Sequence, residues 1–179
     1  MDVSIDTAIL KEMVTNKSEN LKTLSVEKPV LLVFLRHFGC IFCKEALCDL
    51  AEKREQIEDK GIQLVFVHMS ENDVAEEYFT KYNLTGISHI SDPSGNYYKS
   101  FKLTKGSFTQ LYGLSTWIRG YEVKKAGHQL EIAKHLGDST QMPGLFLIHN
   151  GEIRKQFIHK KASQRPDYNT FLNYPVEVQ

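Results

Sequence analysis

The amino-acid sequence predicts an α/β fold in which helices flank a central mixed β-sheet. Two short apolar runs, residues 30–35 and 62–67, are each followed by a stretch whose apolar residues have helical spacing, which is typical of parallel strands joined by helices. A third apolar run, residues 144–149, leads through Asn150 and Gly151 into a further strand-like stretch. Asn-Gly between two such runs predicts an antiparallel hairpin.

The chain before the first strand predicts one amphipathic helix. Within residues 5–16 the apolar side chains stand at helical spacing, and the residues that follow form a polar connector. Residues 30–35 are then apolar without interruption and rich in β-branched and aromatic types. Such a run predicts a strand that is buried on both faces at the centre of the sheet.

Helical spacing returns twice further along the chain. From Cys43 the apolar residues recur among charged ones until Gly61 ends the predicted helix, and residues 73–82 repeat the pattern. Residues 92–95, Asp-Pro-Ser-Gly, predict a turn. Residues 97–103 fit a short helix or an extended segment, and residues 167–172 predict one last helical turn.

Residues 105–137 predict an insertion of one or two helices, because aromatic and basic residues alternate there with several glycines. We expect core packing for its apolar side chains, with a cover over the active site or a homodimer surface as the alternatives. The length and apolar content of the whole chain, 1–179, predict that it forms one domain with a core at about 29–160.

Composition excludes several classes of partner. Lys plus Arg number 22 and Asp plus Glu number 22, so no net field recruits nucleic acid or anionic lipid, and we expect neither nucleic acid nor membrane as a partner. No segment approaches the roughly 20 apolar residues of a membrane span, and the first residues lack the pattern of a targeting signal. These features predict a cytoplasmic protein.

The strongest chemical signal is Cys40-Ile41-Phe42-Cys43, which lies where the first strand gives way to a helix. Two thiols at this spacing can form a disulfide with little backbone movement. The N–H groups and the positive dipole end of the helix favour a thiolate at the first sulfur. Zinc would need two further ligands, and the nearest candidates are Cys48 and His37. Because no second Cys-x-x-Cys or spaced His pair supports a zinc site, we expect no metal and no cofactor.

The order of these elements, with the motifs they carry, is similar to a known family. Residues 33–45, 92–95 and 141–148 resemble the peroxiredoxin-like proteins related to selenoprotein L, within the alkyl hydroperoxide reductase and thiol-specific antioxidant (AhpC/TSA) group. The resemblance covers about residues 30–159. It implies a thioredoxin-like fold with a helical insertion before a hairpin that starts at a cis-proline, Pro143.

The resemblance also implies roles, with two departures. Cys43 takes the position of the peroxide-reactive cysteine. Peroxiredoxins place a threonine three residues before that cysteine, where this chain has Cys40, and a proline four residues before the threonine, where it has Arg36. Because a thiol donates a hydrogen bond less well than the threonine hydroxyl that helps to hold peroxide, the pair resembles a thioredoxin-type exchanger, or a related peroxidase whose partner thiol is local, more closely than an ordinary peroxidase.

Three functional hypotheses follow for the thiol pair. The first is a thiol–disulfide oxidoreductase with Cys40 as the nucleophile, nearer to solvent, and Cys43 as the buried resolving thiol. The second is a thiol-dependent peroxidase, in which Cys43 forms a sulfenic acid that Cys40 resolves. The third is a non-catalytic interaction module of the same fold. The first two hypotheses imply a thioredoxin- or glutathione-type reductant, with a disulfide or a hydroperoxide as substrate.

Five further residues are candidates for binding or activation. Arg36, His37 and Arg119 can favour a thiolate through positive charge, although a structural role is favoured for Arg119. The resemblance implies that Pro143 is cis and leaves the Met142 backbone free to pair with an extended substrate. Cys48 is interpreted as a cysteine on the flank of the helix, with an alternative resolving thiol as the functional reading.

Overall fold

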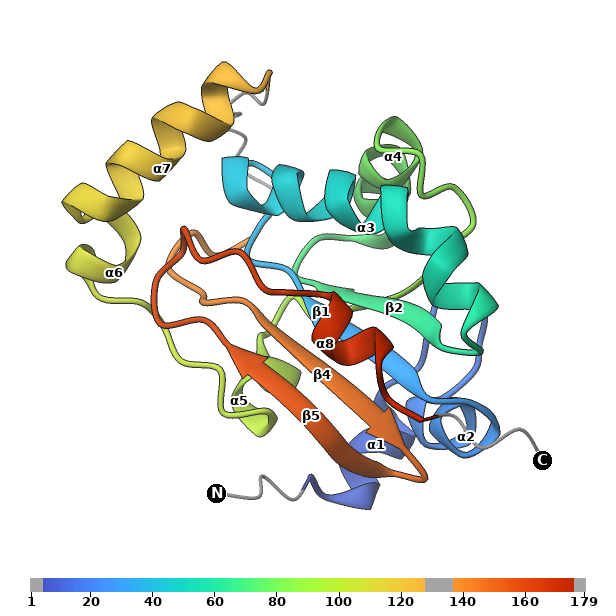
Figure 1. Cartoon of the computed structure of the whole chain (residues 1–179). Helices are drawn as coiled ribbons and strands as arrows, with labels where there is room; N and C mark the ends of the chain where they lie inside the picture. Colours follow the sequence, from blue (N-terminus) through green and yellow to red (C-terminus); the bar gives the residue numbers. More distant parts are fainter. Residues whose placement is uncertain (1–4, 128–136, 176–179) are drawn as a thin grey trace.

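The computed structural model describes residues 5–127 and 137–175 and contains a five-stranded mixed sheet in the order β3-β2-β1-β4-β5 (Figure 1). β1 pairs in parallel with β2, and β2 with β3, whereas β4 is antiparallel to both β1 and β5. The expected mixed sheet is confirmed. The strands are β1 (Val30–Phe34), β2 (Gln63–His68), β3 (Ser88–Ser91), β4 (Gly144–His149) and β5 (Glu152–Ile158).

Helices cover both faces of this sheet. Figure 1 shows α3 and α4 above the sheet, α8 in front of it and α1, α2 and α5 below it, whereas α6 and α7 lie at one side. The helices are α1 (Thr7–Glu12), α2 (Leu21–Glu27), α3 (Ile41–Asp59), α4 (Asn72–Lys81), α5 (Asn96–Ser100), α6 (Phe108–Tyr112), α7 (Leu114–Lys125) and α8 (Asn169–Leu172). None of them has the length and apolar character needed to cross a bilayer.

β1 lies at the centre of the molecule, and every residue in it is buried. Its side chains alternate between two apolar clusters, since successive residues of a strand point to opposite faces. Leu31 and Val33 pack in the cluster that contains residues of α3, α4 and α8, and Leu32 and Phe34 pack with residues of α1, α2 and α5. The strand that carries the chain into the Cys-x-x-Cys segment is therefore fixed from both sides.

The predicted hairpin is confirmed between β4 and β5. Asn150 and Gly151 have φ values of 56° and 76°, and two consecutive residues with positive φ form the tight turn whose twist matches that of the flanking strands. A register shift follows at Leu147/Ile148. The hairpin places β4 beside β1, so that Gly144 pairs with Phe34 and the residues before β4 lie close to the thiols.

The structure differs from the sequence expectation near the N-terminus and at β3. The first helix spans only Thr7–Glu12, and the expected polar connector contains α2, which is capped by the Asn20 side chain and buries Leu21 and Leu24. β3 carries buried polar side chains that obscure its strand pattern. Distant residues bind them, because the buried His89 contacts Glu76 and the partly buried Ser91 donates to the Ser70 carbonyl.

The expectation of a cis peptide bond before Pro143 is wrong, since every peptide bond in residues 5–127 and 137–175 is trans. The Met142 backbone is also not free. Its N–H donates to the Thr104 carbonyl at 3.1 Å, and its carbonyl accepts from the Gln141 side chain at 3.2 Å. The chain at the start of the insertion occupies the hydrogen-bonding positions that an extended substrate would use.

The helices of the insertion are confirmed for the part of it that the structure describes. α6 begins with a capping box in which the side chains of Ser107 and Gln110 bind each other's backbone N–H groups. α7 follows at once and contacts both α6 and α3. Residues 128–136 of the predicted insertion lie outside the described residues.

Tyr98 fastens the end of β1 to its neighbours. Its ring is fully buried against Phe34, and its hydroxyl lies 2.6 Å from the Leu35 carbonyl and 3.1 Å from the Val67 carbonyl. A buried hydroxyl that binds backbone carbonyls stabilises the fold by about 1 kcal/mol. Because Leu35 directly precedes Arg36, this contact holds the strand end from which the thiol segment starts.

We expect Tyr98→Phe to lower the free energy of unfolding by about 1 kcal/mol, because it leaves two buried carbonyls without this donor. Urea unfolding followed by circular dichroism measures the effect. Tyr97→Phe is the matched control, since the Tyr97 hydroxyl binds the Glu12 carbonyl at an exposed position and its loss is expected to cost less than about 0.5 kcal/mol. Equal losses in the two variants contradict the role given to Tyr98.

Candidate active site

Cys40 is the N-cap residue of α3, and Cys43 lies in the first turn of the same helix. The strand–thiol–helix arrangement predicted from the sequence is therefore present. Both cysteines are free and both are buried, with 3% and 4% of their surfaces exposed. The expectation that Cys40 lies nearer to solvent is wrong, because Arg36 binds its sulfur and also binds the Ser139 carbonyl, which closes the chain over it.

Arg36 contacts both thiols through different groups. Its guanidinium Nη1 donates to Cys40 Sγ at 3.2 Å, and its backbone N–H donates to Cys43 Sγ at 3.2 Å. The guanidinium is itself buried, and its Nε has no hydrogen-bond partner among the described residues. These contacts place Arg36 against both thiols, and its activating role stays a prediction.

The environment separates the two thiols in acidity. A hydrogen bond from the Cys43 thiol is the largest cause that lowers the pKa of Cys40 well below its ordinary value, and the charge of Arg36 acts in the same direction against the effect of burial. Burial raises the pKa of Cys43 well above its ordinary value, and the hydrogen bond to Cys40 adds to this. The environment therefore favours the thiolate form at Cys40 and the thiol form at Cys43.

Arg36 and His37 differ as sources of positive charge. Burial by itself lowers the pKa of Arg36, but the charges of Cys40 and Cys43 outweigh burial and raise it, so the guanidinium stays charged. Burial lowers the pKa of His37 below its ordinary 6.5. The imidazole is therefore mainly neutral at pH 7. Of these two sequence candidates, Arg36 is the permanent cation beside Cys40.

A small cavity opens next to the sulfurs. Its volume is about 30 Å³, which is room for about two water molecules or one molecule of the size of hydrogen peroxide. Residues from the thiol segment, α3, the start of β4 and the chain after β5 surround it. Its lining includes Arg36, Cys40, Phe42, Cys43, Pro143 and His159. A reagent in this cavity therefore meets the thiol pair directly.

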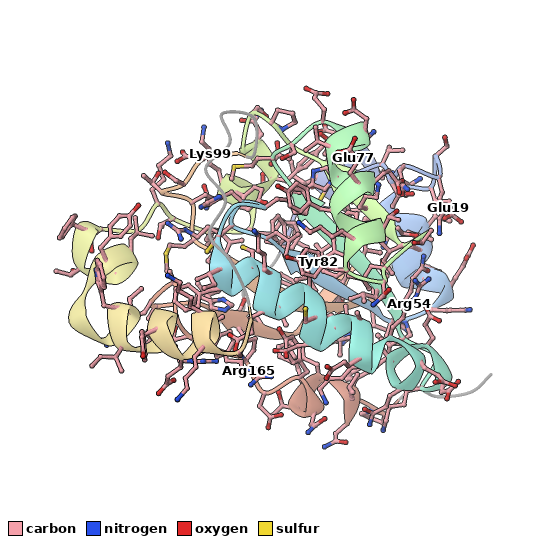
Figure 2. The ribbon with its side chains drawn as sticks, turned by 90° about the horizontal axis from the view of Figure 1, so that it is seen from above. Glu19, Arg54, Glu77, Tyr82, Lys99 and Arg165 are labelled. Atoms are coloured by element: carbon pink, nitrogen blue, oxygen red, sulfur yellow. The ribbon has the colours of Figure 1, made fainter. Side chains whose placement is uncertain are left out.

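Two ion pairs hold neighbouring segments against α3 at this cavity. Glu45 and Asp49, one helical turn apart, both line it. Arg119 of α7 binds Glu45 at 2.5 Å, and Arg165 binds Asp49 through two hydrogen bonds of 2.8 and 2.5 Å. Figure 2 shows α7 to one side of α3 and Arg165 close to α3. Arg119 thus acts on the wall of the cavity, in agreement with the structural role favoured for it.

Pro143 and Met142 take different positions. Pro143 lines the cavity, and its carbonyl accepts a hydrogen bond from His159 Nδ1 at 3.2 Å. Met142 is buried in a small cluster with Leu111, Ala162 and Phe42, which joins the insertion to the chain after β5. Only Pro143 of this predicted pair stands where it can touch a reagent beside the sulfurs.

Sequence reasoning did not find Glu45, Asp49, His159 and Arg165. The helical spacing of Glu45 and Asp49 after Cys40 was the available signal, since residues four apart share one helix face. His159 and Arg165 are distant in sequence and carry no such signal. Cys48 lies on α3, and burial raises its pKa, so it remains a thiol at pH 7. No group of three metal-binding side chains occurs within the described residues.

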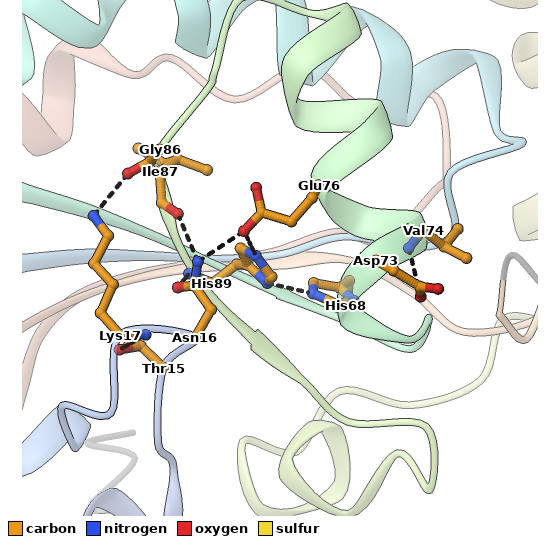
Figure 3. Close-up of polar contacts among 10 residues, drawn as sticks. All are labelled: Thr15, Asn16, Lys17, His68, Asp73, Val74, Glu76, Gly86, Ile87 and His89. Carbon is orange, nitrogen blue, oxygen red and sulfur yellow. Dashed lines mark hydrogen bonds and ion pairs between the residues drawn. The ribbon is translucent and has the colours of Figure 1, made fainter.

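A second polar cluster joins β2, β3 and α4 (Figure 3). His68 Nε2 lies 2.9 Å from His89 Nδ1, and His89 Nε2 lies 2.9 Å from Glu76 Oε1, which also accepts from Asn16. Burial is the main cause that lowers the pKa of His68 to about 3. His68 packs on Phe38, two residues before Cys40, so this cluster lies directly behind the thiol segment.

Comparison with known families gives one match that covers most of the chain. The model of the AhpC/TSA family matches residues 7–156, which include the thiols, all five strands except the end of β5, and the described part of the insertion. The resemblance stated from the motifs is therefore supported over a longer range than the motifs themselves.

Curated relatives carry two kinds of name. Human peroxiredoxin-like 2C is 27% identical over 147 residues, which cover 77% of this chain and 63% of that protein, so this chain spans less than two thirds of its length. The prostamide/prostaglandin F synthase of Salmo salar is 33% identical over 166 residues, covering 92% of this chain and 80% of that one.

Solved structures show the same fold at low sequence identity. The bacterioferritin comigratory protein of Xanthomonas campestris, whose structure was described for its alkyl peroxide reduction activity, superimposes with a TM-score of 0.66 at 11% identity and covers 96% of this chain and 95% of its own. Its identity is too low to carry a function, but it confirms the thioredoxin-like peroxiredoxin fold. With the family match over residues 7–156, the chain belongs to the AhpC/TSA family.

Proposed function

We propose that the protein is a thiol–disulfide oxidoreductase that cycles Cys40 and Cys43 between dithiol and disulfide. The observation that carries the proposal is the contact of Arg36 with both sulfurs, in which its guanidinium donates to Cys40 Sγ and its backbone N–H donates to Cys43 Sγ, each at 3.2 Å. A thiolate beside a buried thiol is the arrangement that exchange chemistry needs, since the thiolate attacks and the thiol resolves.

The proposed cycle has two steps. The Cys40 thiolate attacks one sulfur of a substrate disulfide, forms a mixed disulfide and releases the other sulfur as a thiolate. Cys43 then loses its proton and attacks the Cys40 sulfur, which releases the second substrate thiolate and leaves the Cys40–Cys43 disulfide. Two electrons from a thioredoxin- or glutathione-type dithiol system restore the reduced pair. Such a system operates in a reducing compartment such as the cytoplasm.

Peroxide reduction is the second candidate, favoured by the family and by the volume of the cavity. In this reaction the Cys43 thiolate attacks one oxygen of a hydroperoxide, becomes a sulfenic acid and releases the alcohol or water. Cys40 then attacks the Cys43 sulfur, water leaves and the same disulfide forms. The Arg36 backbone N–H bonded to Cys43 Sγ supports this role, whereas the raised pKa of Cys43 opposes it.

Stopped-flow measurement of thiol oxidation separates the two reactions. For the exchanger we expect slow oxidation by hydrogen peroxide and alkyl hydroperoxides together with reduction of insulin or glutathione disulfide. Fast oxidation by hydroperoxide that is lost in Cys43→Ser identifies the peroxidase instead. If mild oxidant produces no reversible loss of two thiols, neither cycle operates and a binding module of the same fold is the better description.

A further inference from the structure

The insertion carries an exposed aromatic patch that the thiol chemistry does not use. On α7, Trp117 and Tyr121 are 72% and 71% exposed and Ile118 is 57% exposed, whereas Val123 and Thr116 on the same helix are buried. On α6, Phe108 and Tyr112 are also exposed, with ring centroids 5.5 Å apart. We call Phe108, Tyr112, Trp117, Ile118 and Tyr121 the aromatic patch.

Two lysines share the exposed face of α7 with this patch. At about 100° per residue, Trp117, Ile118 and Tyr121 fall within an arc of about 120° that also contains Lys124 and Lys125. Both lysines are exposed. The acidic residue of the helix, Glu122, lies outside the arc and pairs with Arg119. The exposed arc therefore combines large apolar rings with positive charge and has no carboxylate of its own.

The packing of α7 explains why this arc faces outward. Arg119 binds Glu45 of α3, and a side chain at Gly120 would come within 3.7 Å of Phe42, so this side of the helix is turned toward the body of the protein. Figure 1 shows α6 and α7 beside α3 and away from the sheet, and Figure 2 shows them at the edge of the molecule. The aromatic patch is thus presented on a projecting arm.

We propose that the α6–α7 arm docks on the surface of an anionic lipid bilayer. Trp and Tyr rings are the side chains that gather at the boundary between lipid head groups and hydrocarbon, and lysines on the same face can extend toward anionic head groups while their stems stay in the apolar layer. A short helix that carries rings and basic residues binds at the interface without crossing the bilayer.

Local charge supports lipid over a second copy of the chain. The whole chain is neutral, but residues 105–125 contain four Lys or Arg and one Glu, a net charge of +3. This positive field complements anionic lipid. In a symmetric contact between two copies the same arc meets itself and offers the lysines no carboxylate. The neutral overall charge, which argues against a membrane partner, does not apply to this arm.

The chain contains its own probe for this proposal, because Trp117 is its single tryptophan. We expect vesicles of phosphatidylcholine with phosphatidylserine to shift the Trp117 emission to shorter wavelength and to co-sediment with the reduced full-length protein. Vesicles of phosphatidylcholine alone should bind at least about tenfold more weakly, and added salt should reduce the difference.

Two variants and their matched controls complete the test. Ile118→Asp and the double variant Lys124→Glu with Lys125→Glu are expected to weaken binding to anionic vesicles at least about tenfold. Val26→Asp, at a residue 53% exposed on α2, and Lys11→Glu with Lys28→Glu repeat the same changes away from the arm and should leave binding unchanged.

Two results overturn the proposal. One is the absence of vesicle binding in the wild-type protein at low salt. The other is a concentration-dependent dimer in analytical ultracentrifugation that Ile118→Asp dissociates while vesicles have no effect, which assigns the aromatic patch to a second copy. Insulin reduction measured without lipid depends on neither vesicle binding nor dimer formation. A failure of the docking proposal is therefore distinct from a failure of the proposed thiol cycle.

Discussion

Replacing Cys40 with serine is expected to lower the rate of disulfide exchange by at least about a thousandfold. The change removes the sulfur that accepts hydrogen bonds from Arg36 and Cys43 and that carries the lowered pKa. A serine hydroxyl is not ionised at neutral pH and cannot form a disulfide. Reduction of insulin with a thioredoxin-type reductant measures the loss, and Cys48→Ser is the matched control on the same helix, expected to keep nearly full activity.

Cys43→Ser completes this prediction because it stops the cycle one step later. We expect the variant to attack the substrate once and to accumulate a mixed disulfide on Cys40, which mass spectrometry of the intact protein detects. Rapid alkylation by iodoacetamide at pH 7 should persist in Cys43→Ser and disappear in Cys40→Ser. The opposite pattern reverses the roles given to the two sulfurs.

Arg36→Met is expected to raise the pKa of Cys40, because a charge of opposite sign in contact with a thiolate lowers the pKa of that thiol. A thiol with a depressed pKa is reactive when the pH is above that pKa, and it loses its reactivity as the pH falls below the pKa. In the variant this loss should move to higher pH, so that alkylation at pH 7 slows at least about tenfold and recovers at alkaline pH. A pH profile of iodoacetamide alkylation measures the shift.

Arg36→Lys is the matched control, because it keeps the positive charge but changes the geometry of the contacts. The planar guanidinium reaches Cys40 and the Ser139 carbonyl at once, and an ammonium group cannot form the same two contacts. We therefore expect a smaller rise in the pKa of Cys40 than in Arg36→Met. Identical pH profiles in the wild type and in Arg36→Met show instead that Cys43 and the helix dipole alone hold the thiolate.

The fold could be predicted wherever apolar periodicity was strong. Residues 30–34, 41–59 and 144–158 form the expected strand, helix and hairpin, because their patterns and the Asn150-Gly151 turn all favour one structure. β3 could not be predicted, since its buried His89 and partly buried Ser91 look like surface residues until Glu76 and the Ser70 carbonyl are brought to them. α2 was missed for another reason: it is only seven residues long, so its Asn20 cap and the spacing of Leu21 and Leu24 form a weak pattern.

The candidate site divides in a similar way. Spacing placed Cys40 and Cys43 at the start of a helix and Arg36 beside them, and the structure supports that placement. Sequence spacing could not reveal that Cys40 is covered, because the covering contact runs from Arg36 to Ser139, over a hundred residues away. The hydrogen bond that occupies the Met142 backbone likewise runs to a distant residue, Thr104.

By itself, the sequence determined the chemistry that is available: two thiols two residues apart, a strand that delivers them and a helix whose dipole favours a thiolate, all of which are properties of neighbouring residues. Only the tertiary structure decided which sulfur is favoured as the thiolate, how large a cavity lies beside it and which face of the insertion is exposed. Burial, the approach of Arg36 and the packing of α7 on α3 join segments far apart in the chain. Local spacing carries no record of such contacts.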